Sequence, residues 1–122
     1  MLSVDYQIKM KINKREFLDS LDRATLLIKD SDKKPIRLSI DDRTLGLKIS
    51  SLIGSLNEEI DIEKEGNNLV IGFNPKLIID ALRVIDDENV NIYFNNTKSP
   101  CVIKDDAETY IYLILPMGIN EE

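Results

Sequence analysis

An internal repeat in this 122-residue chain predicts an α+β fold. Asn13 and Asn74 lie 61 residues apart, and each opens a similar segment: residues 12–21 read INKREFLDSL, and residues 73–82 read FNPKLIIDAL. Apolar and polar residues alternate before each Asn, as they do in a half-buried strand. We therefore expect two β-α-β-β-β repeats, at about residues 5–63 and 66–117, with two helices packed on antiparallel sheets in a single domain, 1–122.

The first repeat shows signals for each of its elements. Asn13 is a favourable N-cap and Glu16 stands at the third helical position, as in a capping box. A helix is expected from there to about Ile28, with its apolar stripe on one face. Strands are expected at residues 5–12, 36–40, 45–49 and 58–63, with a turn at 41–44 and a loop at 51–57 that contains Gly54.

The second repeat follows a turn at residues 65–68. Asn74 caps its helix, and Pro75 takes the first helical position, where its missing N–H has no helical partner to lose. This helix is expected to run to about Ile85. Strands are expected at residues 69–73, 90–94, 101–104 and 109–115.

Composition argues against an enzyme. The net charge is −6 and the chain has no His, which is the commonest general base and metal ligand. An acidic chain repels nucleic acid unless its basic residues gather on one face. The sequence has one cysteine, Cys101, no apolar run long enough to span a membrane and no signal-peptide pattern at residues 1–6, so we expect a cytoplasmic protein.

Residues 110–115 are apolar at every position. Alternate residues of a strand face opposite sides, and helices can cover only one side of this sheet. Two explanations stay open. The strand is buried on both faces, or one set of its side chains forms an exposed apolar patch of the kind that marks a binding site.

The helix surfaces also carry two open questions. Leu26 lies opposite the apolar stripe of its helix, either as an isolated surface residue or as part of a contact. Four cations project away from the apolar stripes, and acidic residues share those surfaces, so the cations form either an ordinary solvated surface or part of a contact. These cations are Arg15, Arg23, Lys76 and Arg83.

The repeated unit and its ending resemble the third domain of the bacterial sliding clamp, the beta subunit of DNA polymerase III. The resemblance covers nearly the whole chain, and subunits of that family are about three times as long, with three domains of this sliding-clamp fold. The segments that carry it are Arg23-Ala24 with Leu26-Leu27, Gly72-Phe73-Asn74, Glu88-Asn89-Val90 and Leu115-Pro116-Met117.

The resemblance implies a non-catalytic processivity factor. Two subunits of the family close head to tail around duplex DNA, and the ring tethers the replicative polymerase. The catalytic subunit of DNA polymerase III, the clamp loader and repair proteins dock through short peptides. No cofactor, metal or membrane is implied, and the expected location is the cytoplasm, in association with the nucleoid.

The resemblance also assigns residues to surfaces of the ring. The peptide pocket would contain Asn74, Leu77, Lys98, Pro100, Leu113, Leu115, Pro116 and Met117. The joint with a second subunit would contain Leu26, Leu27, Glu58 and Glu59. The four helix cations named above would face DNA. The family often has an aromatic residue at the position of Leu77, so this pocket wall is altered here.

Two other classes of function stay open on sequence grounds. One is a small acidic homodimeric interaction module that shares the repeat but has no DNA role. The other is a carboxylate-dependent hydrolase, which the lack of His and of a metal-ligand cluster disfavours. Binding of polymerase-tail peptides separates a clamp domain from the interaction module.

Overall fold

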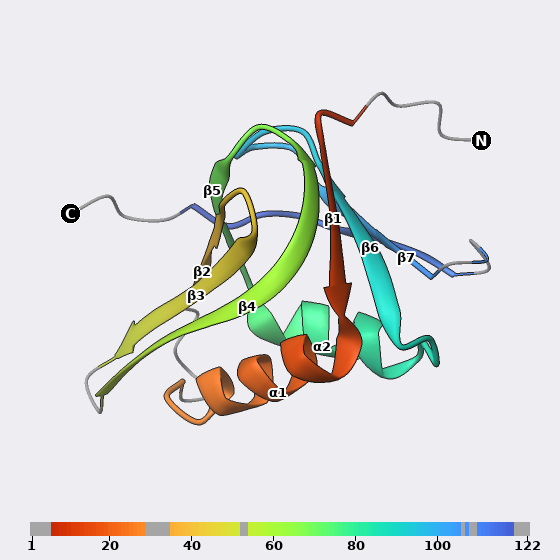
Figure 1. Ribbon diagram of the computed structural model, residues 1–122. Helices are drawn as coiled ribbons and strands as arrows, with labels where there is room; N and C mark the ends of the chain where they lie inside the picture. The colour runs from red at the N-terminus through yellow and green to blue at the C-terminus, as the bar shows by residue number, and fades with distance from the viewer. Residues whose placement is uncertain (1–5, 29–34, 52–53, 106, 108–109, 119–122) are drawn as a thin grey trace.

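The computed structural model describes residues 6–28, 35–51, 54–105, 107 and 110–118. Within these, the β-α-β-β-β unit occurs twice, as the repeat predicts (Figure 1). The elements are β1 (Ile8–Asn13), α1 (Lys14–Thr25), β2 (Ile36–Ile40), β3 (Thr44–Ser51), β4 (Gly54–Gly66), β5 (Leu69–Phe73), α2 (Pro75–Arg83), β6 (Asn89–Phe94), β7 (Cys101–Lys104) and β8 (Ile111–Ile114).

Each helix begins at the predicted asparagine cap. The Oδ1 atom of Asn13 accepts a hydrogen bond from the backbone N–H of Glu16 at 2.9 Å. The Oδ1 atom of Asn74 accepts one from the N–H of Lys76 at 3.0 Å, and Pro75 follows as the first helical residue. Both caps therefore satisfy a backbone donor that has no partner inside the helix.

Both helices end earlier than the apolar pattern predicts. Helix α1 stops at Thr25, because the next three amides bond to carbonyls three residues back rather than four, in a tightened last turn. Helix α2 stops at Arg83, with Val84 as its C-cap and the Ile85 amide bonded to Leu82 O at 3.2 Å. The expected ends near Ile28 and Ile85 were therefore wrong by two or three residues.

Strand β4 joins the two repeats. The sheet runs β5-β2-β3-β4-β1-β6-β7-β8 with antiparallel neighbours throughout. Residues 54–61 of β4 pair with β3, and residues 62–66 pair with β1. Strand β4 is long and strongly curved in Figure 1, and it passes from one half of the sheet to the other.

The loop expected at residues 51–57 was wrong. Strand β3 continues to Ser51 and β4 already begins at Gly54, with Ser51 opposite Gly54 and Ser50 opposite Ser55. Polar residues on both strands concealed the pairing, because backbone hydrogen bonds form a sheet ladder without an apolar alternation. The turn expected from residue 65 also starts later, because β4 extends to Gly66.

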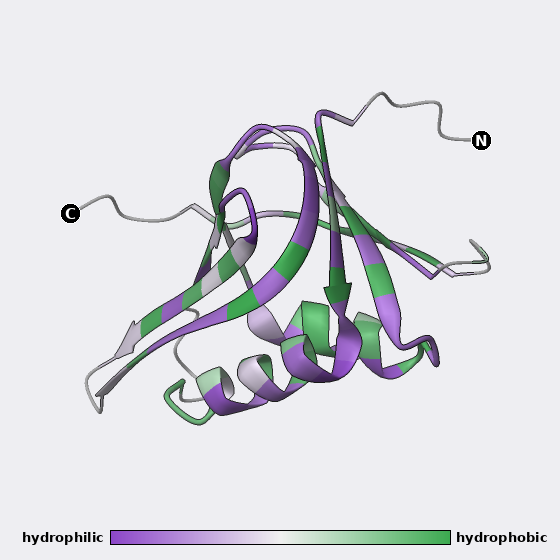
Figure 2. Ribbon diagram, viewed as in Figure 1, coloured by the Kyte–Doolittle hydropathy of each residue, from purple (hydrophilic) through white to green (hydrophobic). Residues whose placement is uncertain are grey.

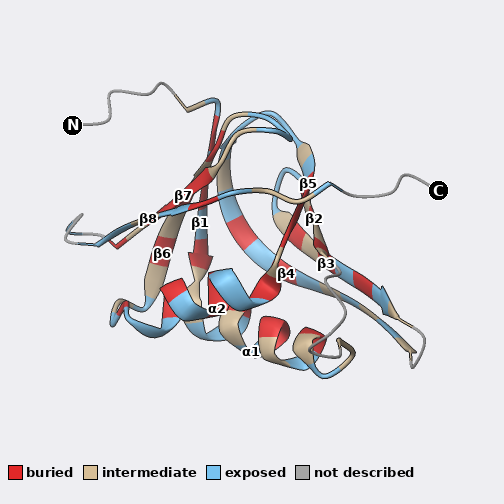
Figure 3. Ribbon diagram, turned by 180° about the vertical axis from the view of Figure 1, so that it is seen from behind, coloured by how far each residue is buried: buried red, intermediate tan, exposed pale blue. Residues whose placement is uncertain are grey.

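The two ends of the sheet are joined by the segment that follows β8. Beyond β8, the Met117 amide donates to the carbonyl oxygen of Gly72 in β5 at 2.8 Å. Figure 3 shows the chain crossing from β8 to β5 along this path. The segment after β8 is thus fixed to the first half of the molecule, which determines where the neighbouring side chains lie.

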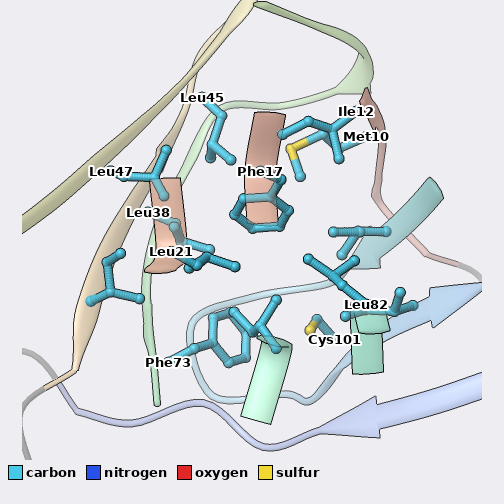
Figure 4. Packing of buried hydrophobic residues seen from close by; sticks show 14 of the residues in the cluster. Met10, Ile12, Phe17, Leu21, Leu38, Leu45, Leu47, Phe73, Leu82 and Cys101 are labelled. Atoms are coloured by element: carbon cyan, nitrogen blue, oxygen red, sulfur yellow. The ribbon is translucent and has the colours of Figure 1, made fainter. Parts of the chain in front are cut away.

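A single core lies between the sheet and the paired helices. The strands alternate more buried and more exposed residues, and the matching alternation of apolar and polar residues appears as green and purple bands along β4 in Figure 2. Phe17 and Leu21 of α1 point into this core together with Phe73 and Leu82 (Figure 4), and all four are fully buried. Cys101 lies in the same cluster, where burial raises the pKa of its thiol to about 12.

An ion pair fixes α1 to the curved part of β4. The Arg23 guanidinium donates from Nε to Glu58 Oε2 at 2.7 Å and from Nη2 to Oε1 at 2.6 Å. Ser20, which is buried, donates its hydroxyl to the same Oε1 at 2.7 Å. These hydrogen bonds, led by that of Arg23, hold the pKa of the Glu58 carboxyl below its usual value.

We predict that Glu58→Gln lowers the urea midpoint of unfolding at pH 7. The folded-state pKa is depressed, so the carboxylate stabilises the fold above its unfolded pKa of about 4.3. This contribution disappears as the pH falls through the lower folded-state pKa, so wild type and Glu58→Gln converge in acid.

Glu59→Gln is the matched control, since Glu59 is the exposed neighbour on the same strand. Urea titrations at pH 7 and pH 3 measure both variants. An equal deficit at the two pH values, or the same deficit in Glu59→Gln, would contradict the role of this pair.

Candidate functional site

A groove opens between α2 and the edge strand β8. Its volume is about 360 Å³. It is lined by Leu77, Asp80, Ala81, Tyr112, Leu113, Ile114 and Leu115. Strand β8 pairs only with β7 among the described strands, so its outer edge remains available beside the groove.

Large apolar side chains of the groove are exposed. The exposed fraction is 48% for Leu77, 60% for Leu113 and 67% for Leu115, whereas Ile114 is buried at 5%. The alternation of strand side chains therefore places Ile114 in the core and its neighbours toward solvent. The terminal segment is not buried on both faces, so of the two explanations left open by the sequence the exposed apolar patch is the one present.

Three of the eight predicted pocket residues line this groove: Leu77, Leu113 and Leu115. Asn74 caps α2 three residues before Leu77, with its carbonyl accepting from the Leu77 amide at 3.1 Å. The other four lie outside the lining. Lys98 and Pro100 belong to the segment between β6 and β7, and Pro116 and Met117 follow the groove toward the contact with β5.

Sequence reasoning missed four lining residues. They are Asp80, Ala81, Tyr112 and Ile114. Asp80 and Ala81 stand three and four positions after Leu77, which is the spacing of neighbours on one helix face. That spacing could have identified them, whereas the part played by Tyr112 and Ile114 depends on how β8 lies against α2.

A second surface forms where α1 ends beside β4. Leu26 is 77% exposed, which agrees with its predicted position opposite the core stripe. Leu27 is partly buried, and its Cδ2 atom lies over Gly54, 3.5 Å from where a Cβ would stand. Glu58 is bound by Arg23, and Glu59 is exposed on the same strand. The four predicted joint residues thus gather on α1 and β4.

This part of β4 has an unpaired edge. Residues 54–61 pair with β3 on one side, and no strand of the described chain occupies the other side. An unpaired strand edge presents backbone donors and acceptors that another strand can bind. The exposed Leu26 therefore lies next to a strand edge that can accept a neighbour.

The four predicted DNA-facing cations are all exposed, and acids engage at least two of them. Arg23 is held by Glu58, so it belongs to the surface formed by α1 and β4. Arg83 of α2 lies 3.7 Å from Asp22 of α1, as an ion pair between the helices. The exposed helix surfaces carry both signs of charge, which weakens their attraction for phosphate.

Within the described residues there is neither a cluster of metal-ligating side chains nor a helix suited to cross a membrane. No group of three or more His, Cys, Asp or Glu side chains in that part of the chain is arranged to hold a metal ion. Among the same residues, no helix has the length and apolar character required to cross a membrane.

Comparison with known proteins identifies a family. The family model described as "DNA polymerase III beta subunit, C-terminal domain" matches residues 1–118. A curated Beta sliding clamp of Staphylococcus aureus is 39% identical over 118 residues, covering 93% of this chain and 31% of that protein. The chain thus spans about a third of the length of the curated relatives it matches.

Solved structures agree in fold. A chain from Eubacterium rectale is 62% identical with a TM-score of 0.93, covering 96% of this chain and 32% of that one. The DNA polymerase sliding clamp of Bacillus subtilis is 30% identical with a TM-score of 0.90, and the match covers 98% of this chain and 32% of that one. These matches support the predicted sliding-clamp fold and favour it over an unrelated interaction module. The chain belongs to the family of C-terminal domains of the DNA polymerase III beta subunit.

Proposed function

We propose that this chain acts as the partner-docking and ring-closing domain of a sliding clamp, a non-catalytic processivity factor for DNA polymerase III. The observation that carries the proposal is the groove between α2 and β8. Its walls expose Leu77, Leu113 and Leu115 without a cover from the described part of the chain. Exposed apolar side chains around a hollow are suited to apolar anchors of a short peptide.

The partners under this proposal are short peptide segments of the polymerase III catalytic subunit, of the clamp loader and of repair proteins. Five predicted pocket residues outside the groove lining, namely Asn74, Lys98, Pro100, Pro116 and Met117, would contact a peptide that extends past the groove. The position of Leu77 at its wall gives a smaller surface than the aromatic residue frequent in the family. The setting would be the cytoplasm, close to the nucleoid.

The second part of the proposal concerns the subunit joint. Leu26, with Leu27 beneath it, would pack against the first domain of a neighbouring subunit, and the unpaired edge of β4 would pair with a strand of that subunit. Glu58 and Glu59 would supply the acidic side of this contact. Such a joint is heterologous, because a different surface of the neighbour completes it.

The third part concerns DNA. The helices α1 and α2 lie side by side and present Arg15, Lys76 and Arg83 on their exposed faces, where acidic residues also stand. Diffuse attraction to phosphates, without reading of bases, suits such a mixed surface. Enclosure by the ring, rather than contact energy, would then keep the protein on DNA.

Peptide docking is tested by substitution in the groove. We predict that Leu113→Ala with Leu115→Ala reduces the affinity for a polymerase-tail peptide by about tenfold or more, because each buried anchor contact contributes about 1–3 kcal/mol. Isothermal titration calorimetry with the isolated chain measures the loss.

Ile111→Ala is the matched control for the groove. Ile111 lies on the same strand and is 51% exposed, but it is outside the groove lining. This variant should bind as wild type does. Unchanged affinity in the double variant would show that the groove is not the docking site.

The joint is tested in a full-length clamp subunit that carries this domain. We predict that Leu26→Asp shifts the subunit toward monomer, because it places a charge in an apolar contact. Val84→Asp is the control, since Val84 is an exposed apolar residue at the C-cap of the other helix. Sedimentation near the dimer dissociation constant reports the result. A dimer as stable as wild type in Leu26→Asp would contradict this joint.

DNA contact is tested with the isolated chain and duplex DNA at physiological salt. We predict binding no tighter than the non-specific range of about 10⁻⁴–10⁻⁶ M, with each phosphate contact adding about 0.9 to the salt slope. Charge reversal at Arg15 and Arg83 in a full-length clamp should reduce loading or sliding and leave the fold intact. Tight, sequence-specific binding of the isolated chain would contradict the clamp function.

A further inference from the structure

One charged side chain lies in a groove that is otherwise apolar. Asp80 is the only Asp, Glu, Lys or Arg among the seven lining residues, and it is exposed. It stands on α2 one turn after Leu77 and next to Ala81, opposite Leu113 and Leu115 at β8. A peptide seated on these leucines would therefore come close to the Asp80 carboxylate.

The Asp80 carboxylate has no partner within the described part of the chain. No hydrogen bond or ion pair there involves it. Arg83, the next cation along α2, lies instead 3.7 Å from Asp22. Because Asp80 is exposed, solvent water is available to hydrate its carboxylate in the absence of a bound partner.

Binding of a peptide would remove part of that water. Desolvating a carboxylate is unfavourable unless a donor or a cation replaces the lost hydrogen bonds. A second carboxylate brought to the same place would add repulsion between like charges. The groove therefore favours peptides that bring a cation to Asp80 and opposes peptides that bring a carboxylate there, in addition to requiring apolar anchors.

We propose that Asp80 is a specificity-determining residue of the docking groove. It selects, among peptides with apolar anchors, those that carry Lys or Arg next to the anchor, and it disfavours those that carry Asp or Glu there. This inference rests on the proposed peptide-docking function and adds to it a preference for the charge of the bound peptide.

Fluorescence anisotropy with labelled synthetic peptides tests the proposal. Each peptide has the same leucine and phenylalanine anchors and one variable residue, Lys, Gln or Glu, placed before, between or after the anchors. The chain is measured as wild type, as Asp80→Asn and as Asp19→Asn at low ionic strength. Asp19→Asn is the matched control, because it removes one exposed acid from α1, outside the groove.

We expect wild type to bind the Lys peptide about three- to tenfold more tightly than the Glu peptide for at least one placement, because the exchange of Lys for Glu replaces one exposed attraction by a repulsion of similar size. Asp80→Asn should bring this ratio close to one, whereas Asp19→Asn should keep the wild-type ratio. Because Asp80 is exposed and makes no contact that holds the described fold, its substitution should not disturb folding.

The possible outcomes distinguish the role of Asp80 from peptide docking itself. Equal binding of the Lys, Gln and Glu peptides by wild type, or an unchanged ratio in Asp80→Asn, overturns the role of Asp80 and leaves peptide docking intact. A ratio lost equally in Asp19→Asn assigns the effect to overall charge and also overturns it. If wild type binds none of the peptides, both the docking function and this inference are overturned.

Discussion

Backbone pairing along β4 is the constraint on which the rest of this structure depends. Residues 54–61 of the strand pair with β3, and residues 62–66 pair with β1, so a single strand joins both repeats into one sheet. Its curvature carries the sheet over the two helices and creates the space that the core fills. This change of partner strand along β4 also leaves a strand edge that matters for function. Where β4 leaves β1, one of its edges is unpaired in the described chain, and the Arg23–Glu58 pair fixes the end of α1 beside that edge.

The two candidate surfaces have the same origin. An antiparallel sheet of this kind has strand edges without a neighbour, and natural proteins cover such edges or use them. At β4 the edge lies beside the exposed Leu26, and at β8 it lies beside the groove under α2. The bond from Met117 to Gly72 keeps the end of β8 near β5 and so maintains the groove. Docking and ring closure would thus use different parts of one sheet.

The repeat made most of the fold predictable from sequence, because each signal was local. Asn13 and Asn74 cap their helices as expected, and period-two alternation located most strands. Prediction from the sequence failed where the pairing of backbones, rather than the pattern of side chains, determines the structure, as at the start of β4. It also missed polar residues that the fold buries. Ser20 is buried and donates its hydroxyl to Glu58, and the side chain of Lys64 is only 3% exposed while its ammonium donates to Asp42 and Asn68. The resemblance located the leucines of the groove, and helical spacing from Leu77 could have added Asp80, whereas Tyr112 and Ile114 became visible only when α2 and β8 were placed together.

The assignment of docking to the groove is tested most directly by a chemical-shift map. A titration of the ¹⁵N-labelled chain with a peptide copied from the tail of a polymerase III catalytic subunit reports which backbone amides sense the partner. We predict changes at Leu77, Asp80 and residues 112–115, with residues 54–61 of β4 unaffected, because the two surfaces serve different partners. Changes centred on Leu26 and β4, or spread without focus over both helices, would contradict the assignment of docking to the groove.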